Sequence, residues 1–332
     1  MGHKGPRTSI SKKTKKNLMV FSGRAHPALA EEVAEDLGTQ LVPTSAYDFA
    51  NGEIYVRFGE SVRGCDAFVL QSHCAPINQW LMEQLLMCDA LKRASVKRTT
   101  VISPFFPNAR QDKKHRGREP ISARLVADMY KTSGADRLMS VDLHAAQIQG
   151  YFDGPVDHLW ALPLLADYVR TRVDRSRLTV VSPDAGRVRV ADLWSDRLGA
   201  PLAIIHKRRD PNVPNQVKVH EVVGDVKGRT CVLVDDMIDT AGTIVQAAEA
   251  LKANGASKIL VAATHAILSG PAVQRLSDGP IDEVVVTNTL PITPDKRWDA
   301  LTVLSIAPLL ARAIREIFDD GSVTSLFEPH SG

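Results

Sequence analysis

The residues best suited to chemistry in this sequence stand where an apolar run meets a short polar turn. The run Val232-Leu233-Val234 leads into Asp235 and Asp236, and after two apolar residues comes the turn Asp239-Thr240-Ala241-Gly242-Thr243. A helical pattern begins at this turn. The first N–H groups of a helix and its partial positive charge attract phosphate. Gly242 allows close approach of the backbone, and the two threonines add hydroxyl donors.

These residues predict a site for a sugar phosphate. In this interpretation the turn holds the phosphate, and Asp235 and Asp236 lie where ribose hydroxyls or a metal ion would bind. The alternative is an acidic cap on an ordinary helix. One acid before a helix would favour that alternative. Three acids and a Thr-Ala-Gly-Thr turn directly after a buried strand favour a function.

Two further turns follow apolar runs and carry acids. Asp142 and His144 project from one side of a strand end, which suits a hard divalent ion bound mostly through water and substrate phosphates. The alternative is a histidine that is only hydrogen-bonded. The turn Ser182-Pro183-Asp184-Ala185-Gly186 is stiffened by its proline, and Gly186 leaves room for a diphosphate.

Basic and hairpin segments add two more candidates. Arg110–Glu119 holds five lysines or arginines in ten residues. It is either a solvated loop or a surface for a polyphosphate, since arginine binds phosphate oxygens through paired hydrogen bonds. Only Arg110 and Gln111 lie close to a strand end, where ligands bind in open α/β sheets. Asn51-Gly52-Glu53 precedes the alternating run Ile54-Tyr55-Val56 and predicts, on local grounds, only a hairpin turn.

The elements that must position these residues alternate between strands and helices. Apolar runs suited to strands buried on both faces occur at Leu18–Phe21, Ala67–Leu70, Thr99–Ser103, Leu138–Val141, Leu178–Val181, Leu202–Ile205, Cys231–Val234, Ile259–Ala262 and Val284–Thr287. Asn78 is predicted to cap one helix and Ser122 another, which Gly134 would end. A third helix is predicted from Thr240 to Asn254. This alternation predicts an α/β fold with parallel sheets.

Length and composition exclude several classes. The 332 residues suit two domains, and 44% hydrophobic with 24% charged residues is ordinary for a folded protein. No apolar run approaches the ~18 residues that a membrane helix needs, and no signal peptide is visible. Residues 1–16 carry six basic residues and no acid, a charge of +6. Because the net charge of the whole chain is +3, the remaining residues together carry −3. This arm is predicted to be disordered and solvated, the alternative being contact with RNA or an acidic partner.

The cysteines and the missing motifs narrow the choice further. Four cysteines without a C-x-x-C pair predict a reduced, cytosolic protein with no zinc site and no disulfide framework. Neither a P-loop nor a Rossmann fingerprint is present, and no serine or cysteine stands in a nucleophile elbow. A mechanism without a protein nucleophile is favoured.

Several segments, in this order, closely resemble the ribose-phosphate pyrophosphokinase family, class I and bacterial type. The resemblance covers residues 17–328 and rests on Phe21-Ser22-Gly23, Phe49–Glu53, Pro104–Arg124, Asp142–His144, Ser182–Gly186, His206–Arg209 and Asp235–Thr243. It implies two tandem type I phosphoribosyltransferase-like domains, over residues 17–158 and 159–320. Residues 1–16 would be the basic arm and 321–332 a tail that packs on the N-terminal domain.

The family resemblance also implies an activity. ATP and ribose 5-phosphate would give 5-phosphoribosyl 1-pyrophosphate and AMP, for nucleotide, histidine and tryptophan biosynthesis. Magnesium, with manganese as a substitute, would be the cofactor, and ADP and inorganic phosphate the effectors. The protein would be a cytoplasmic homohexamer that binds neither nucleic acid nor membranes.

The resemblance assigns roles to individual residues. Lys207 and Arg209, on a segment without helical pattern, would be catalytic, on a loop that closes over ATP. The other roles fall into three sets: ATP at Asn51, Gly52, Glu53, Arg110 and Gln111; metal at His144 and Asp184, with Asp142 in addition; and ribose 5-phosphate at Arg209, Asp235, Asp236, Asp239, Thr240, Ala241, Gly242 and Thr243.

The chain departs from the family pattern at two positions. Many relatives have Asp where Asn51 stands, and a second Gly where Arg187 stands. Asn51 keeps an acceptor without the charge, and Arg187 adds a charge to the predicted diphosphate turn. Two rival interpretations are an ordinary phosphoribosyltransferase, which consumes the diphosphate product, and a non-catalytic regulatory relative. The second should have lost Lys207 and Arg209 or the acids of the phosphate turn, and this chain retains them.

Overall fold

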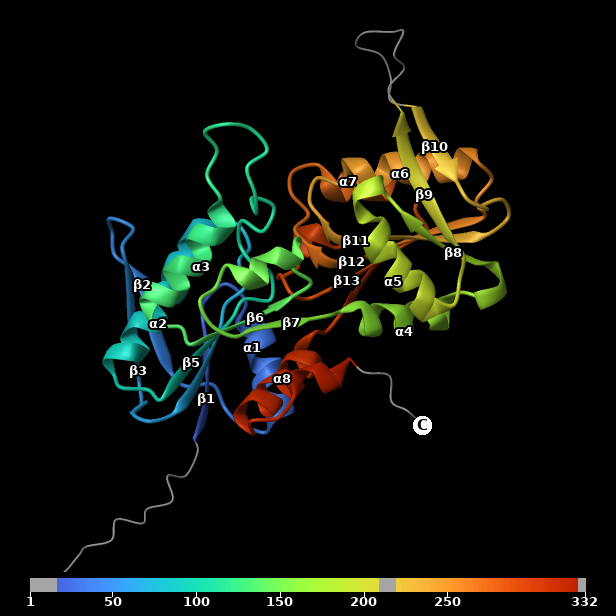
Figure 1. Cartoon of the computed structure of the whole chain (residues 1–332). Helices are drawn as coiled ribbons and strands as arrows, with labels where there is room; N and C mark the ends of the chain where they lie inside the picture. Colours follow the sequence, from blue (N-terminus) through green and yellow to red (C-terminus); the bar gives the residue numbers. More distant parts are fainter. Residues whose placement is uncertain (1–16, 209–218, 328–332) are drawn as a thin grey trace, which may run out of the picture.

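Two sheets, each flanked by helices, form the protein (Figure 1). The computed structural model describes residues 17–208 and 219–327. In the first sheet the strand order is β1-β4-β5-β6-β7, and every neighbouring pair is parallel. The bounds of these strands are Leu18–Ser22, Asp66–Leu70, Arg98–Ile102, Arg137–Val141 and Val156–Leu159. A separate antiparallel hairpin, β2 (Thr44–Asp48) and β3 (Ile54–Phe58), stands beside this sheet.

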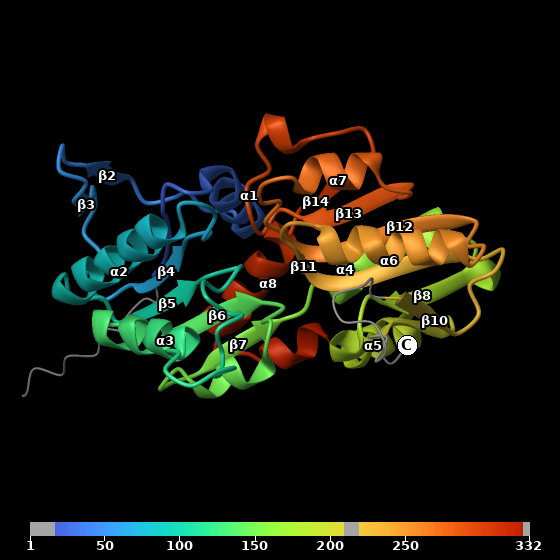
Figure 2. The ribbon, with the colours of Figure 1, turned by 90° about the horizontal axis from the view of Figure 1, so that it is seen from above.

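The second sheet has seven strands in the order β10-β9-β8-β11-β12-β13-β14. All neighbours are parallel except the edge strand β10, which is antiparallel to β9. From β8 to β14 the bounds are Leu178–Ser182, Leu202–Arg208, Val219–Val223, Thr230–Ile238, Lys258–Ala266, Glu283–Thr287 and Leu301–Leu304. Seen from above, the two sheets lie side by side (Figure 2).

All nine predicted strands are present, and the predicted α/β class is confirmed. These strands were recognisable because most of them are buried on both faces; every residue of β4 and β8 is buried. Four further strands, β2, β7, β10 and β14, were not predicted, whereas β3 contains the alternating run Ile54-Tyr55-Val56 that was predicted after a hairpin turn. β2 is largely exposed and all of β14 is only half-buried, so neither shows a continuous apolar run.

Eight α-helices cover the sheets in the part of the chain that the structure describes. They are α1 Pro27–Leu37, α2 Ile77–Arg93, α3 Ser122–Ser133, α4 Leu162–Arg172, α5 Val188–Leu198, α6 Gly242–Ala253, α7 Ala272–Asp278 and α8 Ala307–Phe318. Short 3-10 helices lie at η1 Ala146–Gly150, η2 Arg175–Arg177, η3 Ala185–Arg187, η4 Pro294–Lys296 and η5 Val323–Leu326. None of the helices described is long and apolar enough to cross a membrane.

Two predicted helix caps were wrong and one helix end was right. α2 begins at Ile77 after Pro76, so Asn78 is already inside the helix and caps nothing. Ser122 is the first residue of α3, and its hydroxyl donates to Gln111 Oε1 at 2.5 Å instead of to the helix. Gly134 ends α3 in the left-handed conformation, as predicted. In both failures the predicted residue lies within the helix, where its side chain cannot reach the free N–H groups.

One apolar core joins the two sheets. Alternate residues of β4 and β6, such as Phe68 and Met139, face α1 and α8, and this cluster continues into the α4 and α5 side of the second sheet, with Val180 and Val232. The opposite faces have separate cores under α2 and α3 in the first sheet and under α6 and α7 in the second. Because the central core is continuous, it holds the strand ends of both sheets in a common frame.

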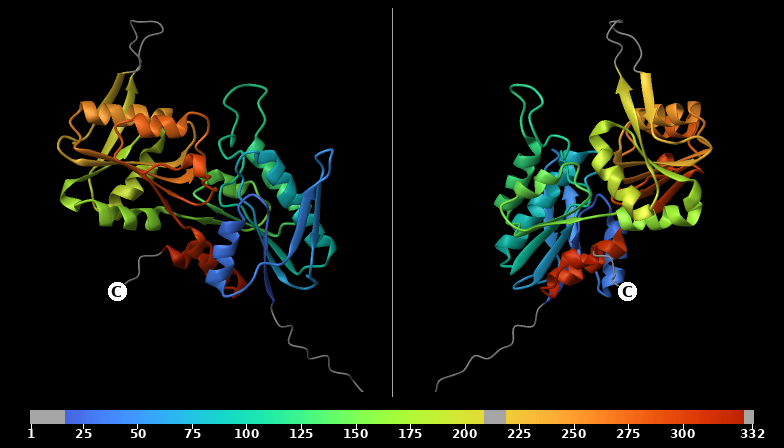
Figure 3. Two further views of the ribbon diagram at one scale, coloured as in Figure 1. Left: turned by 180° about the vertical axis from the view of Figure 1, so that it is seen from behind. Right: turned by 45° about the vertical axis from the view of Figure 1, so that its right-hand side comes forward.

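The C-terminal helix α8 crosses back to the first sheet. The predicted boundaries place residues 307–318 in the second domain, but α8 packs against α1, and Arg315 Nη2 donates to Asp36 O at 3.3 Å. Figure 3 shows α1 in blue and α8 in red side by side. The reason is burial: Leu310 and Ile314 are fully buried in the shared core. Leu326 and Phe327 pack against the same core after η5.

Replacing Leu310 by Ala should lower the free energy of unfolding by about 2–5 kcal/mol, because a fully buried leucine leaves a cavity in the core common to both sheets. Urea unfolding followed by circular dichroism measures the change. Leu193→Ala is the matched control, because Leu193 is 43% exposed on α5, and its effect should stay below about 1 kcal/mol. Equal effects of the two substitutions would contradict the placement of α8.

Candidate active site

The predicted phosphate turn joins the end of β11 to the start of α6. β11 runs through Asp235 and Asp236 to Ile238, and α6 begins at Gly242 with no side chain capping its first N–H groups. Ser269 N donates to Asp239 O at 3.0 Å, and Arg275 Nη1 donates to Thr240 O at 2.9 Å, so the turn is held from outside. A rigid turn with free helix N–H groups is suited to an oxyanion.

The bend of the turn falls on the residue before Gly242. The residue with left-handed backbone is Ala241, with φ of 61° and 5% exposure. A Cβ added to Gly242 would meet only Arg275 Nη1 at 3.5 Å, an ordinary contact. The tight bend therefore falls on a buried alanine, where L residues are strained, and Gly242 leaves open space at the helix start.

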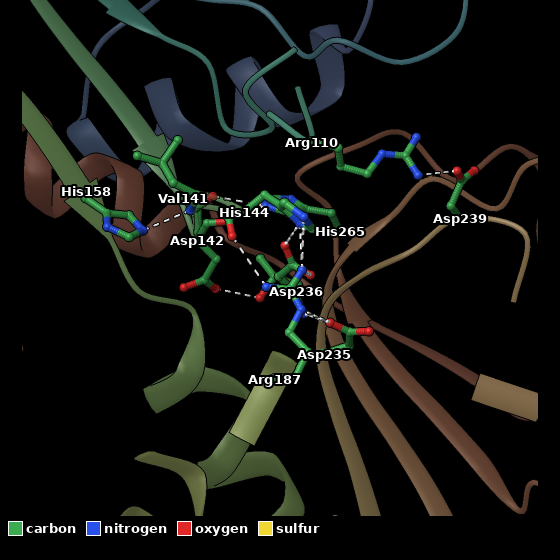
Figure 4. Close-up of polar contacts among 12 residues, drawn as sticks. Arg110, Val141, Asp142, His144, His158, Arg187, Asp235, Asp236, Asp239 and His265 are labelled. Atoms are coloured by element: carbon green, nitrogen blue, oxygen red, sulfur yellow. Dashed lines mark hydrogen bonds and ion pairs between the residues drawn. The ribbon is translucent and has the colours of Figure 1, made fainter. Parts of the chain in front are cut away.

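Arg187 lies at the centre of the site, between residues of both sheets (Figure 4). Its Nε is 3.1 Å from Asp235 Oδ1, and its Nη2 is 2.7 Å from Asp236 Oδ1. The same Nη2 lies 2.6 Å from His144 Nδ1, which in turn lies 2.7 Å from Asp236 Oδ2. The structure thus brings together three predicted site residues, His144, Asp235 and Asp236, around one guanidinium group.

Burial and charge act differently on the two neighbouring acids. Burial, together with the negative charge of Asp236, raises the pKa of Asp235 well above its usual value. Burial also raises the pKa of Asp236, but the hydrogen bond with His144 and the charge of Arg187 outweigh it and hold that pKa well below the usual range. Asp236 is therefore the permanent negative charge of the pair.

Asp142 connects the two sheets. Its Oδ2 accepts hydrogen bonds from Thr264 Oγ1 at 2.5 Å and from Ala161 N at 3.1 Å. Burial raises its pKa to about 6, against the effect of these two bonds. Its backbone φ is 38°, and His265 Nε2 lies 3.0 Å from Val141 O just before it. The predicted metal role of Asp142 remains a prediction, and the contacts show a carboxylate already engaged in the protein.

Asp184 is likewise engaged, as the cap of η3. Its Oδ1 accepts from Gly186 N at 2.8 Å and Arg187 N at 3.1 Å. The short turn that the sequence predicted for a diphosphate therefore also fixes the base of the Arg187 side chain.

The donor atoms at this junction suit a cation, since the Arg187 guanidinium already lies among them. Over residues 17–208 and 219–327, however, no three His, Cys, Asp or Glu side chains form a complete metal-binding set. Magnesium usually keeps several waters and is bound through one or two carboxylates and substrate phosphates. The residues therefore fit an ion that arrives with a substrate.

A cleft of about 810 Å³ opens beside the phosphate turn, between the two sheets. Arg110 and Gln111 line it from the first sheet, and Asp239 and Thr240 from the second. Arg110 Nη1 donates to Asp239 Oδ2 at 2.6 Å across the cleft. The predicted ATP residue and the predicted phosphate turn are thus in direct contact.

Several predicted residues do not line this cleft. They include the predicted metal residues and most of the predicted sugar-phosphate residues: Asp142, His144, Asp184, Asp235, Asp236, Ala241, Gly242 and Thr243. Asn51, Gly52 and Glu53 form the exposed tip of the β2–β3 hairpin and do not line the cleft (Figure 1). Lys207 lies on β9, but its side chain lies outside the described residues, as do Arg209 and the predicted loop after it. The basic arm over residues 1–16 lies outside them too.

Four residues that support the site were missed by the sequence analysis as functional candidates. Arg187 is predicted only to add a charge to the diphosphate turn, and no pattern in the sequence singles out His158, Thr264 or His265. His158 Nε2 accepts from Leu143 N at 2.8 Å and so holds the turn that carries His144. A histidine or threonine within an apolar strand is the only local signal, and it does not reveal which distant residue is the partner.

The fold and the site define a class of protein. A mainly parallel sheet whose central strand ends in two acids, a phosphate turn and an uncapped helix is the arrangement of the type I phosphoribosyltransferase fold, and here it stands beside a second parallel sheet.

Comparisons identify the family within this class. Residues 18–134 match the model of the N-terminal domain of ribose phosphate pyrophosphokinase, and residues 210–328 match the phosphoribosyl synthetase-associated domain. Ribose-phosphate pyrophosphokinase of Streptomyces coelicolor is 70% identical over 97% of this chain and 99% of its own length. That of Mycobacterium tuberculosis is 64% identical over 95% of this chain and 97% of its own.

A solved structure supports the same family. The crystal structure of phosphoribosylpyrophosphate synthetase from Mycobacterium smegmatis matches with a TM-score of 0.87 and 63% identity, covering 92% of this chain and 100% of the other. The chain belongs to the ribose-phosphate pyrophosphokinase family.

Acid should loosen the turn that carries His144. Burial lowers the pKa of His158 to about 4, below the ~6.5 of an unfolded histidine. Its neutral form therefore stabilises the folded state above pH ~6.5, and this contribution is lost as the pH falls toward 4.

His158→Gln keeps a hydrogen-bond acceptor but does not titrate. Between pH 6.5 and 4.5 it should lose about 2 kcal/mol less stability than the wild type in urea unfolding. His206→Gln, an exposed position on β9, should follow the wild type. Parallel pH profiles of wild type and His158→Gln would contradict the role of His158.

Proposed function

We propose that this protein transfers the β,γ-diphosphoryl group of ATP to the C1 hydroxyl of ribose 5-phosphate, giving 5-phosphoribosyl 1-pyrophosphate and AMP. The observation that carries the proposal is the uncapped start of α6, set behind Asp235 and Asp236 and across the cleft from Arg110. This geometry offers an anion site for a sugar phosphate next to a cationic wall for a polyphosphate. The family membership supports both substrates.

In this proposal the Asp239–Thr243 turn binds the 5-phosphate of the sugar through the N–H groups of α6 and the hydroxyls of Thr240 and Thr243. Asp235 and Asp236 accept hydrogen bonds from the ribose hydroxyls and so orient C1 toward the nucleotide. Arg110 and Gln111 bind ATP in the cleft. Positioning of two polyanions is the main task of such an enzyme.

Lys207 and Arg209 are the proposed catalytic groups. The C1 hydroxyl oxygen attacks the β-phosphorus of ATP in line, the bond from this phosphorus to the AMP oxygen breaks, and the hydroxyl proton passes to solvent. The negative charge spreads over the transferred group. Two cations on the β9 side of the site would neutralise this charge in the transition state. The contacts give no side chain a clear role as general base.

A divalent ion would be held by His144 and Asp184, with Asp142 as a further candidate. When bound, magnesium, or manganese in its place, supplies positive charge to the phosphate oxygens and orients them. His144 already lies in the acid cluster, which supports its assignment. Asp142 and Asp184 each already accept two hydrogen bonds from the protein through one carboxylate oxygen.

We further propose a homohexamer in which the hairpin tip Asn51-Gly52-Glu53 binds the adenine of a neighbouring subunit. The exposure of this tip, and its absence from the cleft lining of its own chain, support that arrangement. ADP and inorganic phosphate would act as effectors, at exposed basic residues such as Lys113, Lys114 and Arg116. All four cysteines are free, which supports a reducing, cytoplasmic location.

The direct test is the release of AMP from ATP and ribose 5-phosphate, measured with a coupled assay. Purified wild-type protein should release AMP only when both substrates and magnesium are present. If it released none, but consumed 5-phosphoribosyl 1-pyrophosphate in the presence of a nucleobase, the protein would be an ordinary phosphoribosyltransferase and the proposal would fail.

Lys207→Ala should lower kcat by about 100-fold, the usual effect of removing one transition-state donor. The Kd of ribose 5-phosphate, measured by calorimetry, should change less than about threefold, because Lys207 is proposed to act on the transferred group. Lys258→Ala, at the opposite end of the second sheet, is the matched control and should resemble the wild type. Equal losses in kcat and in affinity would contradict the catalytic assignment.

Shared nucleotide sites can be tested by mixing two inactive variants. Glu53→Ala removes a hairpin contact and Lys207→Ala a catalytic group. If each site combines the hairpin of one subunit with the Lys207 of another, co-expressed hetero-oligomers should regain about one quarter of wild-type sites. Lack of any recovery in oligomers shown to contain both variants would place the hairpin and Lys207 in the same subunit's site.

A further inference from the structure

Arg187 occupies a place that a small substrate or ion would need. Its side chain is only 17% exposed and contacts Asp235 and Asp236 at 3.1 and 2.7 Å. It also reaches the first sheet, through His144 Nδ1 at 2.6 Å and His144 O at 3.4 Å. All of these partners are residues to which the proposed function assigns the sugar or the divalent ion.

The local fold holds Arg187 in this position. The residue ends η3, and its backbone N–H is bound by Asp184 Oδ1 at 3.1 Å, directly before α5 begins at Val188. Because the base of the side chain is fixed, the guanidinium can leave the acids only by rotation about its own side-chain bonds. Such rotation is open to an arginine side chain, which has several rotatable bonds.

The contact between Arg187 and the two acids balances their negative charge. Asp236 is 7% and Asp235 16% exposed, and two such neighbouring acids without a cation would repel each other in poorly solvated surroundings. The guanidinium supplies that cation in the absence of ligands. A divalent ion on the same oxygens would be repelled by the guanidinium, so the two cations compete for the acid pair.

We infer that Arg187 is an internal counter-cation that holds the acid pair and His144 in the ligand-free enzyme and must turn away before a divalent cation and the ribose hydroxyls reach them. Arg187 is thus a positioning residue, and it keeps free metal ions off the acid cluster until substrate arrives. This inference rests on the proposed function, because it takes the acids and His144 as the metal and sugar site.

The test is binding of Mn²⁺ to the full-length protein without nucleotide or sugar, followed by electron paramagnetic resonance. The wild type should bind Mn²⁺ weakly. Arg187→Gln, which is polar and shorter but uncharged, should bind it at least about tenfold more tightly, because the acids lose their competing cation. A purely structural role for Arg187 would not produce such a gain.

Arg189→Gln is the matched control. Arg189 is exposed two residues further along the chain, so the same charge is removed from the surface, and Mn²⁺ affinity should remain that of the wild type. If Arg187→Gln does not fold, Arg187→Lys serves instead: its ammonium group keeps the charge but not the fork, so affinity should rise by a smaller factor, about threefold.

Wild-type Mn²⁺ affinity in folded Arg187→Gln, or in Arg187→Lys where it is used instead, would overturn the inference. An equal gain in Arg189→Gln would also overturn it, since the effect would then be one of general surface charge. Failure of the proposed function is a separate result, because it appears as absence of AMP release by the wild type, whatever the Mn²⁺ affinities are.

Discussion

Two carboxylates stand side by side where the sheets meet, and the surrounding structure is arranged to balance their charge. Asp235 and Asp236 are the last acids on the central strand of the second sheet, largely withdrawn from water. His144 approaches them from the first sheet and Arg187 from the turn before α5. Any ligand that binds here has to neutralise these charges in place of the present partners. Substrate binding therefore depends on the charges that the ligands bring.

The same arrangement appears on the other side of the phosphate turn. Asp239 is paired with Arg110 across the cleft at 2.6 Å, so an acid proposed for the sugar phosphate neutralises a cation proposed for the nucleotide. The charged groups of the site are thus paired with one another, although the proposed function assigns them to two polyanionic substrates. Substrates that bind there must separate these pairs, so each ligand has to supply the charge that the lost partner supplied.

This pairing works only if the sheets keep their relative position. The shared apolar core with α1 and α8, and the polar contacts from Asp142 to Thr264 and from Ser72 to Thr289 O, connect the two halves near the strand ends. In parallel sheets the ligands bind at the carboxyl ends of the strands, and here both sets of ends meet at one junction.

The amino-acid sequence by itself determined the features that depend on neighbouring residues. Continuous β-branched runs mark the central strands because those strands are buried on both faces, and the Asp239–Thr243 turn is legible because strand, turn and helix start are consecutive. Edge strands such as β14 were not predicted, because half-buried residues give no continuous apolar run in the sequence. The tertiary structure alone decided which distant residues meet: Arg187 with Asp236, 49 positions apart, Arg110 with Asp239, 129 apart, and α8 with the first sheet. Such pairs follow from how the whole core packs, and no local stretch of sequence carries that information.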